Sequence, residues 1–197
     1  MRKLNRFALK ITILFFIFFN IEVNSKTVSL GAPESKITIK VFSSLTCPAC
    51  ANFHLKIFSN LKKDFIDKGL VRFEHHPFPL DLAALNAEII LRCYVDKDKK
   101  FALLGKIYEK QQSWAVGSDI NKINDSIKKI GLEVNLKNEK MDGCLKNNKI
   151  QDEILTQRIE AQKKYKIEAT PTILINEKEY TGKVNYKEFK KTLEKNL

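Results

Sequence analysis

The sequence predicts an α/β domain that is interrupted by an all-helical insertion, and three observations support this fold class. Residues 37–76 have the pattern of a strand, a helix and a second strand. Residues 81–166 then contain helical patterns and no convincing strand. Sheet-like sequence returns directly after this segment, ahead of one last helix. We therefore divide the chain into an α/β domain, residues 26–80 and 167–197, and an inserted helical subdomain.

The first 25 residues have the pattern of a secretory signal peptide. Four basic residues up to Lys10 are followed by the apolar run Ile11–Phe19, and modest side chains lead to a cleavage point after Ser25. An uncleaved membrane anchor is the alternative, but the run is short for the roughly 20 residues that span a bilayer. We expect cleavage after Ser25 and export into an oxidising compartment.

The chain is basic, with a formal net charge of +12. The signal segment holds four basic residues and one acidic residue, so about +9 remains without it. A basic surface is compatible with nucleic acid or membrane contact. Lysines are nevertheless interleaved with Glu and Asp along every predicted helix, and no cluster of aromatic and basic residues is present. We therefore expect no nucleic-acid partner.

Two cysteines mark the start of the first helix. Cys47 and Cys50 lie between the strand pattern Ile37–Phe42 and the helical pattern Ala51–Phe65. Pro48 suits the first helical position, because the N–H that it lacks would have no partner there. Cys47 is then the N-cap, and its sulfur lies over the helix N-terminus. The apolar residues of this helix recur every four positions: Phe53, Ile57, Leu61 and Phe65.

Two further strands flank this unit. Leu70–His76 alternates between apolar and polar residues and is stopped by two prolines, so it predicts a strand parallel to the first. A short strand that ends in a turn is predicted at residues 28–33.

The insertion is predicted to contain a series of amphipathic helices. Ser118 is predicted to cap one of them and Gly131 to end it. A longer helix is predicted from Ile150 to Lys164. The residues predicted to face inward include Leu82, Leu85, Ile89, Cys93, Phe101, Leu104, Tyr108, Ile154, Leu155 and Ile159.

The last segment predicts a hairpin and a helix. Pro171 leads the strand Thr172–Ile175, and Asn176-Glu177 is a plausible two-residue turn into the edge strand Lys178–Thr181. Asn185 begins a pattern typical of a capping box, which opens the final helix.

These elements together resemble the thioredoxin fold with an inserted all-helical subdomain, and in particular the DsbA-type periplasmic oxidoreductases. The active-site stretch Ser44–His54 is similar to the alphaproteobacterial branch, as are Phe78–Asp81 and Arg92-Cys93. The resemblance covers the whole mature chain. It implies localisation in the periplasm and protein-disulfide exchange without a cofactor.

The cysteine pair carries the expected chemistry. Cys47 is the candidate nucleophile, because the helix N-terminus stabilises its thiolate. Cys50, one turn into the helix, is the resolving cysteine. The resemblance implies a cis Thr170–Pro171 bond against the cysteines, with both residues binding substrate. The alternative is that Pro171 merely starts a strand.

Two positions depart from the family pattern. Ala49 stands where the family often has histidine, and Val41 stands where many members have a buried acid. We therefore expect a weaker oxidant than a Cys-Pro-His-Cys enzyme, but a stronger one than thioredoxin, whose potential is about −270 mV. Measurement of the reduction potential tests this.

His54 is a candidate for tuning the thiolate, because it lies on the same side of the helix as the cysteines. Packing within the fold is the alternative and the more common role of such a histidine. A zinc or copper site formed by Cys47, Cys50 and His54 is a further reading, but Cys-x-x-Cys-x-x-x-His is a poor match to structural zinc spacing. We therefore expect no metal.

Cys93 and Cys144 are expected to form a second, structural disulfide in an oxidising compartment, and the resemblance implies the same pairing. The alternative is two buried free thiols. The leading function is an exported dithiol oxidase that acts on reduced client proteins and is reoxidised by a membrane partner. The alternatives are a disulfide isomerase or reductase, and a periplasmic metal-binding protein. No heptad run precedes Lys36, so we expect a monomer.

Overall fold

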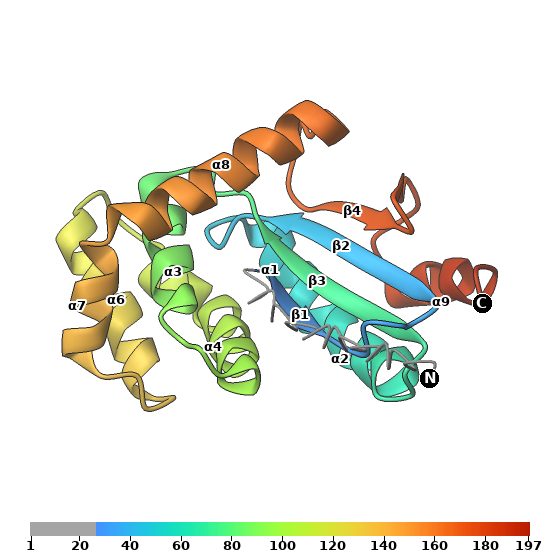
Figure 1. The fold of residues 1–197 in the computed structure, drawn as a ribbon, viewed down its shortest axis with the longest axis horizontal. Coiled ribbons are helices and arrows are strands. Elements are labelled where there is room, and N and C mark those ends of the chain that lie inside the picture. The colour runs from blue at the N-terminus through green and yellow to red at the C-terminus, as the bar shows by residue number, and fades with distance from the viewer. Residues whose placement is uncertain (1–26) are drawn as a thin grey trace, which may run out of the picture.

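The computed structural model describes residues 27–197, so the predicted signal peptide, residues 1–25, lies outside the described residues. A five-stranded sheet forms the centre of the α/β domain (Figure 1). Its strand order is β1-β3-β2-β4-β5. The strands are β1 (Val28–Leu30), β2 (Ile37–Ser43), β3 (Val71–Pro77), β4 (Thr172–Ile175) and β5 (Lys178–Glu179).

Strand pairing brings distant parts of the chain to one end of the sheet. β2 and β3 are parallel, as the strand–helix–strand pattern predicts. β4 runs antiparallel to β2, and Thr172 lies opposite Phe42. The chain that enters β4 therefore lies beside the end of β2 that leads into the cysteines. β1 and β5 are the edges, and both pair antiparallel with their neighbours.

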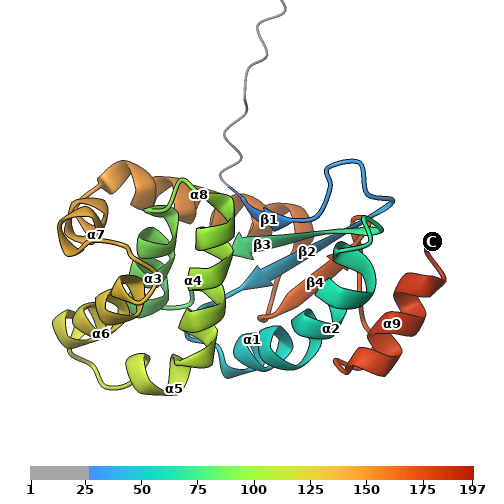
Figure 2. The ribbon, with the colours of Figure 1, turned by 90° about the horizontal axis from the view of Figure 1, so that it is seen from below.

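A helical rod from Pro48 to Ile66 covers one face of the sheet (Figure 2). It comprises α1 (Pro48–Phe53), the π-helical η1 (His54–Phe58), α2 (Ser59–Leu61) and the π-helical η2 (Lys62–Ile66). The apolar residues predicted for its inner face are all buried: Phe53, Ile57, Leu61 and Phe65. Burial of each such side chain contributes about 1.5–3 kcal/mol, so this face fixes α1 on the sheet.

The final helix, α9 (Tyr186–Glu194), lies on the same side as α1 and α2 (Figure 2). The Asn185 side chain accepts a hydrogen bond from the Glu188 N–H, which confirms the predicted cap. Phe189 meets Phe53 edge to face, with ring centroids 5.9 Å apart. The other face of the sheet packs against the end of α8 through a smaller cluster that includes Phe42, Leu174 and Ala161.

The helical insertion lies beside the α/β domain (Figures 1 and 2). It comprises α3 (Leu82–Arg92), α4 (Lys97–Glu109), α5 (Gln111–Trp114), α6 (Ile120–Leu132), α7 (Asn138–Leu145) and α8 (Asn148–Tyr165). Side chains of Asp81, Asp96, Asp119 and Asn147 cap the N-termini of α3, α4, α6 and α8. No helix between residues 27 and 197 is long and apolar enough to span a bilayer.

The structure corrects two details of the predicted insertion. The cap of α6 is Asp119, not Ser118, because the Asp119 carboxylate accepts from the N–H groups of Asn121 and Lys122. The predicted end of α6 at Gly131 is correct to within one residue, because the last helical residue is Leu132. Leu82 and Ile159 were expected to face inward but are 55% and 50% exposed, since each lies on the solvent side of its helix.

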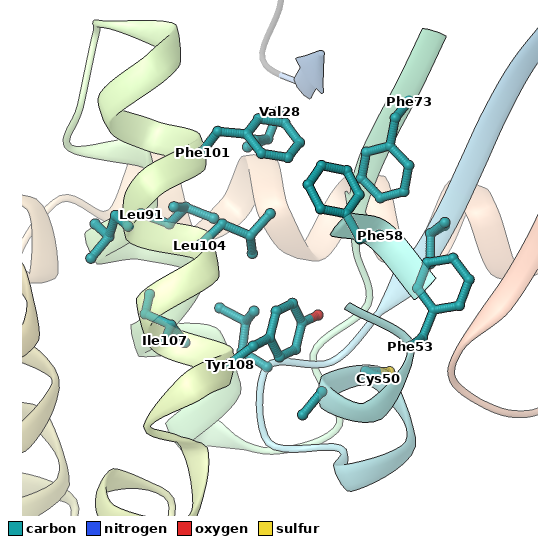
Figure 3. Close-up of a cluster of buried hydrophobic side chains, with 14 of the residues drawn as sticks. Val28, Cys50, Phe53, Phe58, Phe73, Leu91, Phe101, Leu104, Ile107 and Tyr108 are labelled. Atoms are coloured by element: carbon teal, nitrogen blue, oxygen red, sulfur yellow. The ribbon is translucent and has the colours of Figure 1, made fainter. Parts of the chain in front are cut away.

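The insertion and the α/β domain share one hydrophobic core, and this places α4 against the back of the site. Figure 3 shows side chains of α4 reaching toward α1 and β3. Phe101 stacks on Phe58 with ring centroids 5.5 Å apart and meets Phe73 edge to face at 5.9 Å. Tyr108 and Cys50 belong to the same cluster. The cysteine helix is therefore held between sheet and insertion.

Candidate active site

The two cysteines occupy the first turn of α1. Cys47 is the N-cap with extended backbone geometry, and Pro48 is the first helical residue, as predicted. Both thiols are free in this structure; Cys47 is half-buried, whereas Cys50 is buried. The more accessible sulfur is therefore the one at the helix N-terminus, where helix dipole and unpaired N–H groups favour negative charge.

The segment that enters β4 forms the wall opposite Cys47. The Thr170–Pro171 peptide bond is cis. The Cys47 Sγ–H donates to the Thr170 carbonyl oxygen at 3.3 Å. The Thr170 hydroxyl group is buried and has no hydrogen-bond partner in the described part of the chain. The strand register described above is what brings these residues, 123 positions apart, into contact.

The pKa of the Cys47 thiol lies below its usual value. Burial opposes ionisation, but interactions with Thr170, with the backbone N–H groups of Cys50 and Ala49, and with the Cys50 thiol outweigh it. These groups stabilise the thiolate, which is both the nucleophile and the better leaving group in disulfide exchange.

The pKa of the Cys50 thiol is raised to about 12. Burial is the main cause, and the negative charge of Cys47 adds to it. The pair is therefore asymmetric: at neutral pH the half-buried Cys47 sulfur ionises more readily, while the buried Cys50 sulfur keeps its proton. Such an asymmetry suits an attacking Cys47 and a resolving Cys50.

The insertion holds the cysteine loop through Gln111. This side chain is buried, and its Nε2 donates to the carbonyl oxygens of Leu45 at 2.8 Å and Cys47 at 3.0 Å. Sequence reasoning missed Gln111, because a glutamine that is followed by a second one, Gln112, carries no distinguishing signal.

A second contact joins the loop to the start of the insertion. Thr46 Oγ1 donates to Asp81 Oδ2 at 2.7 Å, and the Leu80 N–H donates to the Ser44 hydroxyl at 3.3 Å. The other oxygen of Asp81 caps α3 by accepting from the Ala84 N–H. One carboxylate thus ties the residue before Cys47 to the first insertion helix.

An open groove of about 570 Å³ adjoins Cys47. One side is formed by Thr46, Cys47 and Pro48. The other sides come from the insertion and the loop before it: Leu80, Asp81, Leu82, Ala83, Ala115, Gly117, Ser118, Ile120 and Ile123. Leu80 and Leu82 are more than half exposed, so the groove presents apolar surface next to the reactive sulfur.

His54 is packed within the fold. Its ring stacks on Phe58 with centroids 4.7 Å apart and lies 5.0 Å from the ring of Tyr108. Burial, and then the nearby His75, lower its pKa to about 3. His54 is therefore neutral at physiological pH, and it lies among aromatic rings. Residues 27–197 contain no group of three or more His, Cys, Asp and Glu side chains that could hold a metal ion.

Cys93 and Cys144 are joined by a disulfide, with Cα atoms 6.1 Å apart. It connects the residue that follows α3 to α7 within the insertion. The bond lies apart from the cysteine loop, so it braces the helical subdomain. The two positions that depart from the family pattern differ in environment: Val41 is buried in β2, and Ala49 is exposed at the helix start.

Comparison with known proteins gives a consistent result. A protein-family profile described as thioredoxin matches residues 23–195. The disulfide bond formation protein D of Bacillus subtilis is 32% identical over 180 residues, which cover 85% of this chain and 76% of that protein. A putative protein-disulfide oxidoreductase of Rickettsia bellii is 29% identical over 162 residues, or 82% of this chain and 61% of that protein.

Solved structures show the same similarity. The crystal structure of Wolbachia pipientis alpha-DsbA1 superposes with a TM-score of 0.79 at 27% identity, and covers 86% of this chain and 89% of that one. The oxidised BdbD of Bacillus subtilis superposes with a TM-score of 0.77 at 25% identity, over 87% of this chain and 92% of that one.

Proposed function

Because the chain belongs to the thioredoxin family and is a DsbA-like protein-disulfide oxidoreductase, we propose that it oxidises exported client proteins in the periplasm. The observation that carries this proposal is the asymmetry of the cysteine pair. Cys47 is accessible with a lowered pKa, while Cys50 is buried with a raised one. Stabilising the Cys47 thiolate stabilises the reduced form, which makes the disulfide a better electron acceptor.

The reaction consists of two exchanges. A client thiolate attacks the Cys47 sulfur of the Cys47–Cys50 disulfide, and Cys50 leaves as a thiolate and takes up a proton. A second client thiolate then attacks the client sulfur of the mixed disulfide and releases Cys47 as a thiolate. Two electrons pass from the client to the protein. A membrane partner that accepts these electrons restores the disulfide.

Client binding uses the surface around Cys47. The backbone of Thr170 borders the sulfur and can pair with an extended client segment. The groove between the cysteine loop and the insertion offers apolar contacts beside it. Neither feature requires a particular client sequence, and this suits an enzyme that acts on many unfolded substrates.

Trapping of mixed disulfides tests this function. Cys50→Ser removes the resolving thiol, so client proteins should accumulate on Cys47 when the variant is exported in living cells. The Cys47→Ser/Cys50→Ser double variant is the matched control and should trap none. Failure of the single variant to form adducts above this control would contradict the proposal.

A second assay separates oxidase from isomerase. The oxidised protein should form disulfides in a reduced multi-cysteine substrate faster than it unscrambles a mispaired one. A faster unscrambling reaction would instead assign the isomerase function.

A further inference from the structure

The groove beside Cys47 differs in charge from the chain as a whole. Lys and Arg outnumber Asp and Glu by 35 to 23 in the sequence, yet no basic side chain of residues 27–197 lines this groove. Asp81 is the one charged residue among the described residues that line it. Because the groove adjoins the sulfur that a client thiolate attacks, a client segment that occupies it lies next to this carboxylate.

Two hydrogen bonds hold the Asp81 carboxylate at the edge of the groove. Oδ2 accepts from Thr46 Oγ1, and Oδ1 accepts from the Ala84 N–H, each at 2.7 Å. Asp81 is nevertheless exposed, and within the described part of the chain it forms no ion pair. Each oxygen of an ionised carboxylate can accept more than one hydrogen bond. Asp81 can therefore still bind a cation that comes from another chain.

The helix N-termini around the groove act in the opposite direction, because they attract anions. The dipole of α3 offsets about half of the Asp81 charge, which leaves the carboxylate with a partial negative charge. The N–H groups that an anion would need are already taken at α6, where Asp119 accepts from the first turn. At α1 the first helical residue is Pro48, which has no N–H to donate. The group that remains able to bind a charged client residue is the Asp81 carboxylate.

Exposed apolar side chains surround this carboxylate. Leu80 and Leu82, its two neighbours in the chain, are 54% and 55% exposed. Val116, which lies between two residues that line the groove, is 59% exposed. Figure 2 shows α1, α5 and α6 along one edge of the molecule, the lower edge in that view. Apolar side chains gathered around a polar group are typical of a surface that binds a partner. The matching partner has apolar residues and a positive charge.

We propose that Asp81 makes the enzyme select client segments that carry a lysine or arginine near the reacting cysteine, among apolar residues. This rests on the proposed function of the cysteine pair. The basic side chain of the client pairs with the Asp81 carboxylate while the client thiolate attacks Cys47. The Cys47–Cys50 bond breaks and the two electrons move as in any other client. Asp81 therefore changes which client reacts faster and leaves the exchange chemistry as it is.

The test measures how fast dithiol peptides reduce the oxidised protein. Two peptides share one apolar sequence and carry either a lysine or a glutamate beside each of their two cysteines. Acid quenching followed by alkylation gives the rate constant for reduction of the Cys47–Cys50 disulfide. The ratio of the lysine rate to the glutamate rate is compared between wild type and Asp81→Asn, so that the reactivity of each peptide cancels. Reaction of the same peptides with hydroxyethyl disulfide gives their intrinsic ratio.

Wild type should favour the lysine peptide beyond the intrinsic ratio. Asp81→Asn should lower the lysine-to-glutamate ratio by about twofold to fivefold at low ionic strength, the range expected for an exposed ion pair. Asparagine is as good an N-cap as aspartate, so α3 keeps its start. In wild type, 1 M salt should remove most of the preference as well, because the Debye length falls to about 3 Å.

Asp96→Asn is the matched control. Asp96 caps α4 as Asp81 caps α3, but it does not line the groove. This variant should keep the wild-type ratio at every salt concentration. A third peptide without charged residues should reduce wild type and both variants at the same rate, because it forms no ion pair with either carboxylate.

Three results would overturn the proposal. One is an Asp81→Asn ratio equal to that of wild type, and another is a wild-type preference that salt does not weaken. The third is a wild-type preference for the glutamate peptide, which would assign the groove to acidic segments. Should Asp81→Asn fail to fold, the salt dependence of wild type decides. The peptides need neither export nor a cellular client, so a failure of trapping by Cys50→Ser leaves this test valid.

Discussion

The side-chain amide of Gln111 donates a hydrogen bond to the carbonyl oxygen of Cys47, 64 residues earlier in the chain. The same nitrogen donates to Leu45, so one buried side chain of the insertion satisfies two carbonyl groups of the cysteine loop. The Cys47 carbonyl also accepts from the N–H groups of Cys50 and Ala51, but the Leu45 carbonyl lies outside any helix or strand and depends on Gln111 for its donor. The insertion therefore shapes the site as well as bordering it.

Replacement of Gln111 by leucine should destabilise the loop. Gln111→Leu leaves the Leu45 carbonyl without a donor and removes one of the donors to the Cys47 carbonyl, which should lower the free energy of unfolding by about 1–3 kcal/mol. Gln112→Leu is the control, because Gln112 is exposed and should change stability by less than about 0.5 kcal/mol. Urea unfolding of the reduced proteins measures both. Equal effects in the two variants would contradict the structural role of Gln111.

Thr170→Val should raise the pKa of the Cys47 thiol. After burial, which acts in the opposite direction, interaction with Thr170 is the largest influence on this pKa. The Thr170 hydroxyl has no partner while the Cys47 thiol is protonated, so it is free to donate to the thiolate, and loss of this donor should shift the pKa by roughly one unit. The rate of Cys47 alkylation as a function of pH measures the shift. Thr172→Val makes the same change two residues later, where the hydroxyl donates to Ala169, and should leave the Cys47 pKa unaltered.

The stability of the reduced protein should rise with pH because of Cys47. The folded pKa lies below the unfolded one, so the stabilisation is fully present above the unfolded value of 9.0 and is lost as pH falls through the folded pKa. Cys50 acts in the opposite direction, since its pKa is raised to about 12, and destabilises only above pH 9.

Urea unfolding of the reduced Cys50→Ser protein between pH 5 and pH 8 isolates this contribution of Cys47. The free energy of unfolding should increase over this range relative to the Cys47→Ser/Cys50→Ser variant. A difference between the two that does not vary with pH would refute the lowered pKa.

The disulfide of the insertion should contribute to stability without altering the redox site. It closes a loop with a sequence separation of 51 residues, for which the loop-entropy relation gives about 4 kcal/mol. Cys93→Ala/Cys144→Ala should therefore lose about 2–4 kcal/mol of unfolding free energy. The Cys47 alkylation profile should remain that of wild type, which serves as the internal control.

Alanine substitutions at two helical glycines should have different effects on stability. A Cβ atom at Gly131 of α6 would lie 2.4 Å from the Met141 sulfur of α7, whereas one at Gly143 would meet nothing within 4 Å. Gly143→Ala should stabilise the protein by about 0.5–1 kcal/mol through helix propensity. Gly131→Ala should lose this gain or reverse it, because the buried Met141 must move. Thermal unfolding compares them, and an equal gain in both would contradict the close packing of α6 on α7.

Periodicity and capping in the sequence were enough to predict the framework of the fold. The parallel pair of strands, the helix that starts at Pro48, the helical insertion and the Asn185 cap all depend on local patterns of apolar and capping residues. The local pattern gave the wrong N-cap where two residues suited to that position were adjacent. Ser118 and Asp119 both suit an N-cap, and only the geometry of the chain selects the carboxylate.

A further error came from a tertiary arrangement that a pattern does not contain. Ile159 has the expected spacing for burial, yet α8 extends past the insertion and exposes it.

The sequence predicts the reactive residues of the site but not the residues that surround them. The spacing of Cys47 and Cys50 at the start of a helix predicts their role. Gln111 acts through contacts with residues 64 and 66 positions away, so no local pattern distinguishes it from other polar residues.

The position of Thr170 opposite Cys47 also has a consequence during synthesis. Cys47 leaves the ribosome 123 residues before Thr170. At about 5–20 residues per second, translation takes roughly 6–25 s to supply the second half of the contact. Throughout this interval the nascent chain contains Cys47 and Cys50 but not the Thr170 segment that lies opposite them. For part of the interval it also contains Cys93 without Cys144. The Cys93–Cys144 pair is complete once Cys144 has been made, whereas the Cys47–Cys50 pair meets Thr170 only when the last strands of the sheet are made.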